Sequence, residues 1–217
     1  MVLDLVCKTD FQFTELGHYT FPLSKFLYGQ AYKERMSTTN LPIDKVNKMT
    51  YEEFIECFGN VVEHCSLCAA AVWRERPFRD AQCLATCFGD FIDRLPISGK
   101  EGILRLHPDL AGRLAQAGKL TSESTREQAN AGLGRMSGEE QQRMNRLNER
   151  YKDKFGFPFV ICARENKKDA ILHGLEERLE NSPQTESITG ANEVKKICRL
   201  RILDIVNPNS QLTHSPL

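Results

Sequence analysis

The sequence predicts an all-α protein, with a single domain of about eight helices and one extended segment. Apolar residues recur every three or four positions in several stretches, which is the period of an amphipathic helix. A Thr or Ser stands three residues before a Glu at Thr50 to Glu53 and at Ser137 to Glu140, a pattern that caps helix N-termini. No stretch shows the alternating pattern of a half-buried strand.

The composition excludes some classes of partner. The 217 residues include 29 basic and 29 acidic side chains, so the chain has no net charge and no electrostatic footprint for nucleic acid. No run of about 18 apolar residues is present, so we expect no membrane span. Eight cysteines without a recognisable secretory signal predict free thiols in a reducing compartment.

The periodic pattern divides the chain into three parts. Residues 1–40 lack a sustained period and are predicted to be an N-terminal extension, poorly ordered or loosely docked. Residues 41–207 carry the helical patterns and form the predicted domain. Residues 208–217 are predicted to be a polar C-terminal tail.

Three helices are predicted in the first half of the domain. The first follows the cap at Thr50, carries apolar residues at helical spacing as far as Trp73, and stops before Pro77. The second covers Asp80 to Leu95. The third is a short helix that opens near Ser98 and ends in a turn at His107 and Pro108.

The second half begins with a short helix from Ser124 to Leu133. A long helix follows the cap at Ser137, and its apolar stripe ends at Phe155. The run from Phe155 to Ala163 breaks the pattern, because Pro158 forces the residue before it into an extended conformation. Two helices complete the domain, at Lys168 to Glu180 and about Thr185 to Val206.

His107 is the first candidate for chemistry. Pro108 fixes its own φ and lacks a backbone donor, so the turn after the histidine is stiff. A stiff turn holds an imidazole in place, and histidine titrates near neutral pH, as a general acid requires. The alternative is a helix-terminal histidine that faces the last carbonyl groups of its own helix. Periodicity alone favours this structural alternative.

Ser124, Glu127 and Arg201 also have two interpretations each. The spacing of Ser124 and Glu127 is that of a capping box, although a helix N-terminus can also bind an anion or a carbonyl oxygen. Arg201 interrupts an apolar stripe, and a buried guanidinium is costly unless it is paired. Its five donors suit a carboxylate or a planar amide, whereas its stem alone would suit an apolar surface.

The extended segment and the cysteines complete the candidates. An extended run outside a sheet leaves backbone groups in need of partners, which a planar polar ligand or a packed core can supply. The pairs Cys65/Cys68 and Cys83/Cys87 have spacings that a zinc site could use. All four lie in predicted amphipathic helices without flanking glycines, so buried thiols are favoured over zinc.

Four separated motifs, in order, resemble those of the OHCU decarboxylase family. These enzymes act on 2-oxo-4-hydroxy-4-carboxy-5-ureidoimidazoline in urate degradation. The motifs occupy Glu101–Gly112, Ser124–Leu133, Phe155–Arg164 and Glu193–Arg201, and the resemblance covers about residues 40–206. Residues 1–40 resemble nothing in the family core.

The resemblance implies an all-helical homodimer with no metal and no organic cofactor. It implies that His107 is the catalytic proton donor and that Glu127 and Arg201 complete the site. The positions implied to contact substrate are Pro108, Ser124, Thr125, Arg126, Glu127, Gln128, Phe159, Val160, Ile161, Cys162, Ala163 and Arg201.

The expected reaction is loss of CO2 from the substrate followed by protonation by His107, giving (S)-allantoin. Arg201 and the backbone of residues 159–163 are expected to hold the carbonyl and ureido groups. The alternatives are a non-catalytic helical interaction module and a zinc-binding adaptor. Family members often act in peroxisomes, and Ser215-Pro216-Leu217 resembles the peroxisomal signal S-K-L without its basic residue, so a peroxisome is expected ahead of the cytoplasm.

Overall fold

The computed structural model describes residues 40–212. The predicted N-terminal extension therefore lies outside the described residues, apart from Asn40, and so do the last five residues of the predicted tail. Within the described range the all-α prediction is confirmed, since ten α-helices and two 3-10 helices are present and only isolated bridges replace a sheet. The helices are α2 (Ile43–Asn47), α3 (Tyr51–Phe58), α4 (Ser66–Val72), η1 (Trp73–Glu75), α5 (Ala81–Arg94), α6 (Ile97–Leu104), α7 (Arg113–Gln116), α8 (Ser122–Ala131), η2 (Leu133–Arg135), α9 (Gly138–Phe155), α10 (Lys168–Arg178) and α11 (Pro183–Ile205).

The first predicted helix is in fact two helices. A loop at residues 59–65 separates α3 from α4, and within it His64 has a φ of +50°, which a helix does not allow. The side chain of Asn60 accepts a hydrogen bond from the His64 N–H at 3.0 Å and closes the loop. Apolar spacing could not reveal this break, because Val61 and Val62 are buried in the loop as they would be in a helix.

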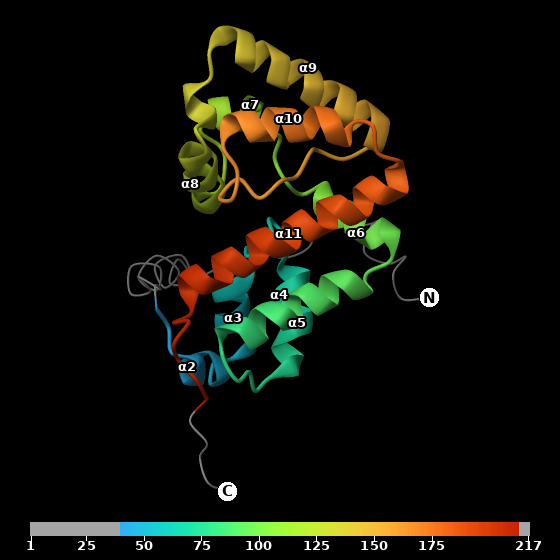
Figure 1. Cartoon of the computed structure of the whole chain (residues 1–217). Coiled ribbons are helices and arrows are strands. Elements are labelled where there is room, and N and C mark those ends of the chain that lie inside the picture. Colours follow the sequence, from blue (N-terminus) through green and yellow to red (C-terminus); the bar gives the residue numbers. More distant parts are fainter. Residues whose placement is uncertain (1–39, 213–217) are drawn as a thin grey trace, which may run out of the picture. The chain divides into compact units, whose positions relative to one another are not determined.

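Helix α11 organises the described domain. It packs mainly against α5 and α6, and α9 contacts it as well. Figure 1 shows α11 crossing the middle of the domain, with α3 to α5 on one side and α9 and α10 on the other. Gly190 of α11 allows close contact with α6, because a Cβ built at this position would lie 2.9 Å from a methyl carbon of Leu104. The end of α6 is thereby fixed against α11.

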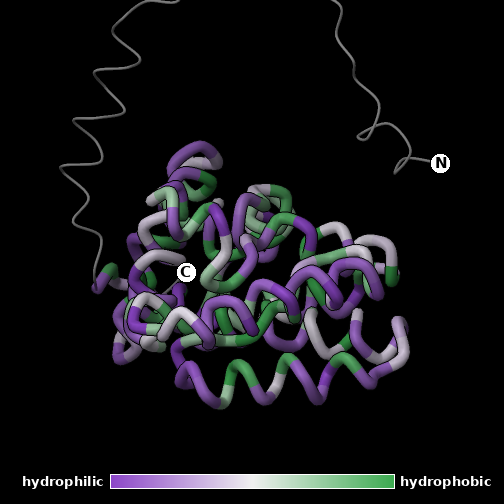
Figure 2. Tube along the Cα trace, turned by 90° about the horizontal axis from the view of Figure 1, so that it is seen from above, coloured by the Kyte–Doolittle hydropathy of each residue, from purple (hydrophilic) through white to green (hydrophobic). Residues whose placement is uncertain are grey.

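Two capping boxes and the alternation of residue types support the predicted helices. Thr50 and Ser137 cap α3 and α9, and Glu53 and Glu140 return the reciprocal hydrogen bonds. Figure 2 shows hydrophilic and hydrophobic positions alternating along the helices, as expected where one face of each helix is buried. None of the helices among residues 40–212 is long and apolar enough to span a bilayer.

The start of the predicted polar tail packs on the domain. Ser210 Oγ accepts a hydrogen bond from the Ile43 N–H at 3.0 Å, and the Leu212 N–H donates to the Arg79 carbonyl oxygen at 2.8 Å. Residues 208–212 therefore continue the ordered structure beyond the boundary that composition suggested.

The described cysteines are free thiols, as predicted. They are Cys57, Cys65, Cys68, Cys83, Cys87, Cys162 and Cys198, while Cys7 lies outside the described residues. Residues 40–212 contain no group of three or more His, Cys, Asp or Glu side chains arranged to hold a metal ion. The alternative of a zinc-binding adaptor thus gains no support from the geometry.

Candidate active site

His107 lies in the turn after α6, as the sequence predicted. Its backbone N–H donates to the Leu104 carbonyl oxygen at 3.1 Å, which extends the last turn of the helix. Its Nδ1 donates to the Ile103 carbonyl oxygen at 2.9 Å, and only 9% of the residue is exposed. The alternative of a helix-terminal histidine is therefore correct for one edge of the ring, which faces a carbonyl group at the end of α6.

The other edge of the ring is chemically available. Nε2 of His107 is buried and has no hydrogen-bond partner among residues 40–212. Since Nδ1 carries the proton that bonds Ile103, Nε2 of the neutral ring presents a lone pair. Burial lowers the pKa of His107 to about 4, although the Ile103 carbonyl and the charge of Glu63 raise it. The free site thus holds a neutral imidazole, whereas the sequence predicted titration near neutrality.

This pKa predicts a loss of stability in mild acid. Between the ordinary histidine pKa of 6.5 and the folded value of about 4, the unfolded imidazole binds a proton that the folded one does not. The free energy of unfolding should therefore fall by about 3 kcal/mol as the pH drops through this range. Urea unfolding at a series of pH values measures the fall, and His107→Gln should remove it. Parallel pH curves for the two proteins would contradict the prediction.

Helix α8 begins earlier than the spacing suggested. Its N-cap is Thr121, whose hydroxyl accepts the Ser124 N–H at 3.3 Å, so Ser124 and Glu127 do not form the predicted capping box. Both side chains point into the domain and are buried. Ser124 Oγ donates to Glu63 at 2.9 Å, and Glu127 is bound by Arg201. The structural interpretation of this pair is wrong, because their polar atoms bind other elements.

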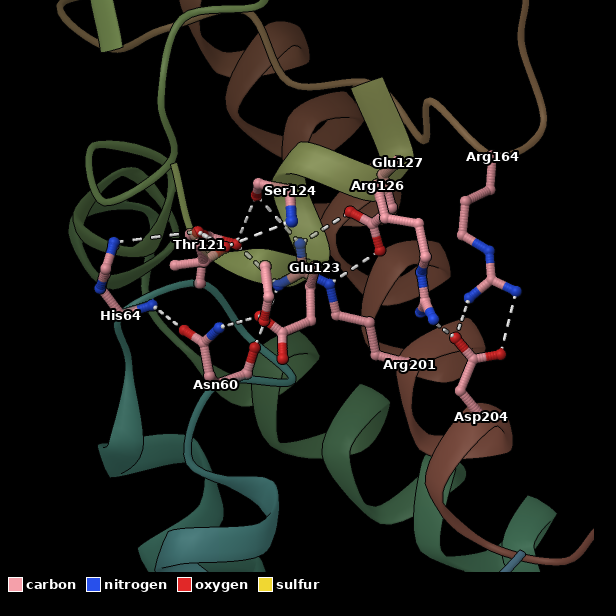
Figure 3. Close-up of polar contacts among 12 residues, drawn as sticks. Asn60, His64, Thr121, Glu123, Ser124, Arg126, Glu127, Arg164, Arg201 and Asp204 are labelled. Carbon is pink, nitrogen blue, oxygen red and sulfur yellow. Dashed lines mark hydrogen bonds and ion pairs between the residues drawn. The ribbon is translucent and has the colours of Figure 1, made fainter. Parts of the chain in front are cut away.

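Arg201 is the centre of a buried ion-pair cluster, which we define as Glu63, Ser124, Glu127 and Arg201. Figure 3 shows the guanidinium of Arg201 reaching toward Glu127 and Ser124 from α11. All five of its N–H groups are bonded. Nε and Nη2 donate to the two oxygens of Glu127 at 2.9 and 2.7 Å, and Nη2 also donates to Ser124 Oγ at 3.2 Å. Nη1 donates to Glu63 at 2.7 Å and to the Asn60 carbonyl oxygen at 3.0 Å.

The charges of the ion-pair cluster do not cancel. Two carboxylates surround one guanidinium, so the cluster has a formal charge of −1 when both are ionised. Burial raises the pKa of Glu63, but Arg201 and the hydroxyls of Thr121 and Ser124 outweigh burial and hold it below its usual range. Burial opposes the charged form of Arg201, and the bonds with Glu127 outweigh it and raise the pKa of the guanidinium. Glu63 and Arg201 are thus both ionised at neutral pH.

The extended segment is confirmed, and its backbone groups divide into two sets. The Cys162 N–H donates to Glu193 at 2.8 Å, and the Cys162 carbonyl oxygen accepts from Asn166 at 3.0 Å. Among residues 40–212 no protein group bonds the N–H of Ile161 or Ala163. Successive N–H groups of an extended chain point to opposite sides, so the Ile161 N–H faces away from Glu193, whereas Ala163 already lies in the turn that follows.

A cavity joins these features. Its walls come from the turn after α6, from α8, from the extended segment and from α11, and are formed by His107, Pro108, Leu110, Ser124, Glu127, Gln128, Phe159, Val160, Ile161, Ala163, Ile197 and Arg201. The volume of about 30 Å³ exceeds the roughly 10–15 Å³ that one water molecule needs, so the cavity can admit a polar group.

Nine of the twelve predicted substrate contacts line this cavity, and three do not. Thr125 and Arg126 are exposed on the outer face of α8, where Arg126 pairs with Asp204. Cys162 is buried on the opposite side of the extended segment, with its N–H bound to Glu193. These three were inferred from continuous motifs. On a helix, however, one face holds positions i, i+3 and i+4 and the residues between them point away, and on an extended segment every second residue points away.

Three residues of the site were missed by the sequence reasoning. Leu110 and Ile197 are apolar wall residues, which periodicity cannot distinguish from ordinary core. Glu63 is fully buried in the ion-pair cluster. The one available signal for it was an acidic residue inside an apolar run, between Val62 and Cys65.

Comparison with known proteins identifies the family to which the chain belongs. Residues 47–203 match the family model described as OHCU decarboxylase. The chain is 54% identical over 173 residues to the 2-oxo-4-hydroxy-4-carboxy-5-ureidoimidazoline decarboxylase of Amia calva, which covers 80% of this chain and 98% of the relative. The protein of the same name from Xenopus laevis is 49% identical over 165 residues, or 76% of this chain and 94% of the relative.

Two solved structures are similar. One, titled OHCU decarboxylase in the presence of (S)-allantoin, has a TM-score of 0.54 and 26% identity and covers 71% of this chain and 96% of its own. The other, titled (S)-allantoin synthase, has a TM-score of 0.62 and 22% identity, covering 76% of this chain and 54% of its own, and bears on the fold alone.

Proposed function

The chain belongs to the OHCU decarboxylase family, and from this premise we propose that it converts 2-oxo-4-hydroxy-4-carboxy-5-ureidoimidazoline to (S)-allantoin in urate degradation. One structural observation supports this catalytic activity. It is the buried His107, whose Nε2 has no protein partner and which shares a cavity with Glu127 and the extended segment. A helix-terminal histidine with a purely structural role would not need an open nitrogen at such a cavity.

The reaction proceeds by loss of CO2 from C4 of the substrate. The electron pair of the broken bond passes into the adjacent C=N group of the ring, so the substrate supplies its own electron sink and the chemistry requires no Schiff base. The ring nitrogen of this group takes a proton from water as it receives the electron pair, so the product of this step is an enol at C4. It becomes allantoin when the C4 hydroxyl loses its proton and C5, which bears the ureido group, gains one.

His107 serves both of these proton transfers. In its neutral form Nε2 accepts a hydrogen bond from the C4 hydroxyl and takes its proton as the enol collapses. The same nitrogen then delivers a proton to C5 from one side, which fixes the S configuration. A positioned acid or base contributes about 10²–10⁴-fold. The low pKa of the free site agrees with this order of events, because His107 begins without a proton on Nε2.

The charge of the ion-pair cluster orients the substrate. With every N–H of Arg201 already bonded, the guanidinium holds Glu127 rather than gripping the substrate. Glu127 has lone pairs left for N–H groups of the ring or the ureido group. Its charge repels the substrate carboxylate toward the N–H groups of Ile161 and Ala163 and the apolar wall. An apolar surrounding favours decarboxylation, because charge leaves the carboxylate in the transition state.

The direct test is an assay on the purified protein. Substrate generated freshly from urate should disappear faster in its presence, and circular dichroism should report (S)-allantoin rather than a racemate. Glu127→Gln should lower the rate with little change in folding. If the substrate decays at the same rate with and without protein, the family activity is absent and the non-catalytic interaction module becomes the better proposal.

We propose further that the protein is a homodimer, as the family resemblance implies. Several large apolar side chains are exposed on the described surface, among them Leu67 at 61% and Ile188 at 45%, and burying such residues is a common reason for self-association. Light scattering should then give twice the chain mass of 24.7 kDa. A mass of 24.7 kDa at micromolar concentration would exclude a stable dimer.

A peroxisomal location is proposed on the same resemblance. A fluorescent fusion at the N-terminus, with the C-terminal residues 215–217 intact, should coincide with a peroxisomal marker. Removal of these three residues should disperse it. A diffuse signal from the intact chain would favour the cytoplasm.

A further inference from the structure

We infer that Glu63 is a positioning residue for the reaction, because it holds Arg201, and through it Glu127, in the geometry that the substrate meets. This inference rests on the proposed decarboxylation. Glu63 does not line the cavity, so it acts through other side chains rather than on the substrate. It comes from the loop between α3 and α4, an element that contributes no wall of the site.

The first argument is the burial of the carboxylate. Glu63 is 0% exposed, and a buried carboxylate is strongly unfavourable unless it is paired and hydrogen-bonded. Each oxygen is bonded. Oε1 accepts from Thr121 Oγ1 at 2.7 Å, and Oε2 accepts from Ser124 Oγ at 2.9 Å and Arg201 Nη1 at 2.7 Å. Its partners belong to the start of α8 and to α11, so one side chain links three elements.

The second argument is the geometry of Arg201. A guanidinium is planar, and its two edges present donors in fixed directions. Glu127 occupies the edge formed by Nε and Nη2, while Glu63 and the Asn60 carbonyl oxygen occupy Nη1. The two carboxylates therefore hold the plane from opposite ends. Without Glu63, the Asn60 carbonyl oxygen would be the one acceptor left at Nη1 among residues 40–212, so this end of the plane, and with it Glu127, would be held less firmly.

The third argument is the construction of the loop. The positive φ of His64 and the closing hydrogen bond from Asn60 turn the chain so that Glu63 points inward while His64 is exposed. A continuous helix from Tyr51 to Trp73 would be the simpler structure for this sequence pattern. The break brings the carboxylate to Arg201, which is 138 residues away in the sequence.

The substitution Glu63→Gln tests the inference, because it keeps the shape and removes the charge. We expect kcat for allantoin formation to fall by about 10–100-fold, the usual effect of removing a group that orients a reacting residue. KM should change by less than about threefold, since Glu63 does not contact the substrate. An unchanged kcat together with a lower melting temperature would reduce Glu63 to a structural role and overturn the inference.

Glu123→Gln is the matched control. Glu123 also connects this loop to α8, by accepting from Asn60 Nδ2 at 3.2 Å, but it does not bond Arg201. Its rate should stay within about twofold of the parent protein. An equal loss of kcat in this variant would mean that loosening the loop is sufficient, and the inference would fail.

A double-mutant cycle separates positioning from an independent contribution. If Glu63 acts through Arg201 on Glu127, adding Glu63→Gln to Glu127→Gln should lower kcat much less than it does in the parent protein. Multiplicative losses would contradict the inference. If Glu63→Gln does not fold, Glu63→Asp keeps the charge but shortens the side chain, and the same cycle applies. A wild-type protein without activity would instead contradict the proposed function, so the two failures are distinguishable.

Discussion

Replacement of His107 by alanine is expected to lower the rate of (S)-allantoin formation by about 10²–10⁴-fold. Among residues 40–212, the His107 imidazole is the buried group at the cavity whose nitrogen lacks a hydrogen-bond partner, whereas both oxygens of Glu127 are bound by Arg201. The turn that carries it should survive, because its backbone bond to Leu104 does not depend on the side chain.

The measurement should follow two products of the chemistry separately. Circular dichroism reports the S isomer, and chromatography reports total allantoin of either configuration. Without His107, residual decarboxylation should give racemic allantoin, because water then protonates C5 from both sides. Gly102→Ala is a suitable control in the same helix, since a Cβ at that position has no neighbour within 4 Å. Normal stereospecific turnover by His107→Ala would exclude the role proposed here.

The second large effect concerns stability. Arg201→Leu should lower the free energy of unfolding by about 3–5 kcal/mol, because it leaves Glu63 and Glu127 buried without a cation. Activity should be lost as well, since nothing then holds Glu127. Urea unfolding measures the first effect. Arg143→Leu breaks an exposed ion pair with Glu176 and should cost no more than about 1 kcal/mol.

The pH dependence of the Arg201→Leu variant provides a check on the cause. Loss of the guanidinium should raise the pKa of Glu63 above its unfolded value, because burial, the largest influence on it, is then opposed by the hydroxyls of Thr121 and Ser124 alone. A carboxyl with a raised pKa favours the folded state in acid and loses that contribution as the pH rises. The deficit should therefore be smaller at pH 5 than at pH 8. An equal deficit at both values would mean that lost packing, rather than unpaired charge, destabilises the variant.

Local patterns predicted most of the helices. The capping boxes at Thr50 and Ser137, and the proline after α5, mark boundaries by hydrogen bonds or backbone geometry that depend on neighbouring residues only. The loop at residues 59–65 was missed because its apolar residues are buried either way. The positive φ of His64 is a backbone conformation that apolar spacing does not report, and the side chain of Asn60 closes the loop by accepting from the His64 N–H.

The site was also predicted only in part, because local sequence patterns identify single residues but not their distant partners. His107 was found from the stiff turn, and Arg201 from its place in an apolar stripe, and both are buried at the cavity. The five bonds of Arg201 were not predictable, because they come from a loop and a helix 74 or more residues earlier in the sequence. The capping pattern at Ser124 and Glu127 was misleading, since Thr121 is the actual cap.

The extended segment has a consequence for mutational tolerance. The N–H groups of Ile161 and Ala163, which have no protein partner among residues 40–212, belong to the backbone and are present whatever side chain the residue carries. The orientation of these groups depends instead on Glu193, which holds Cys162, and on Arg178, which donates to the Val160 carbonyl oxygen at 2.8 Å. Conservative changes at Ile161 should therefore be tolerated better than changes at Glu193 or Arg178. Substitutions that weaken ligand binding by this segment should therefore be most severe at Glu193 and Arg178, which do not line the cavity themselves.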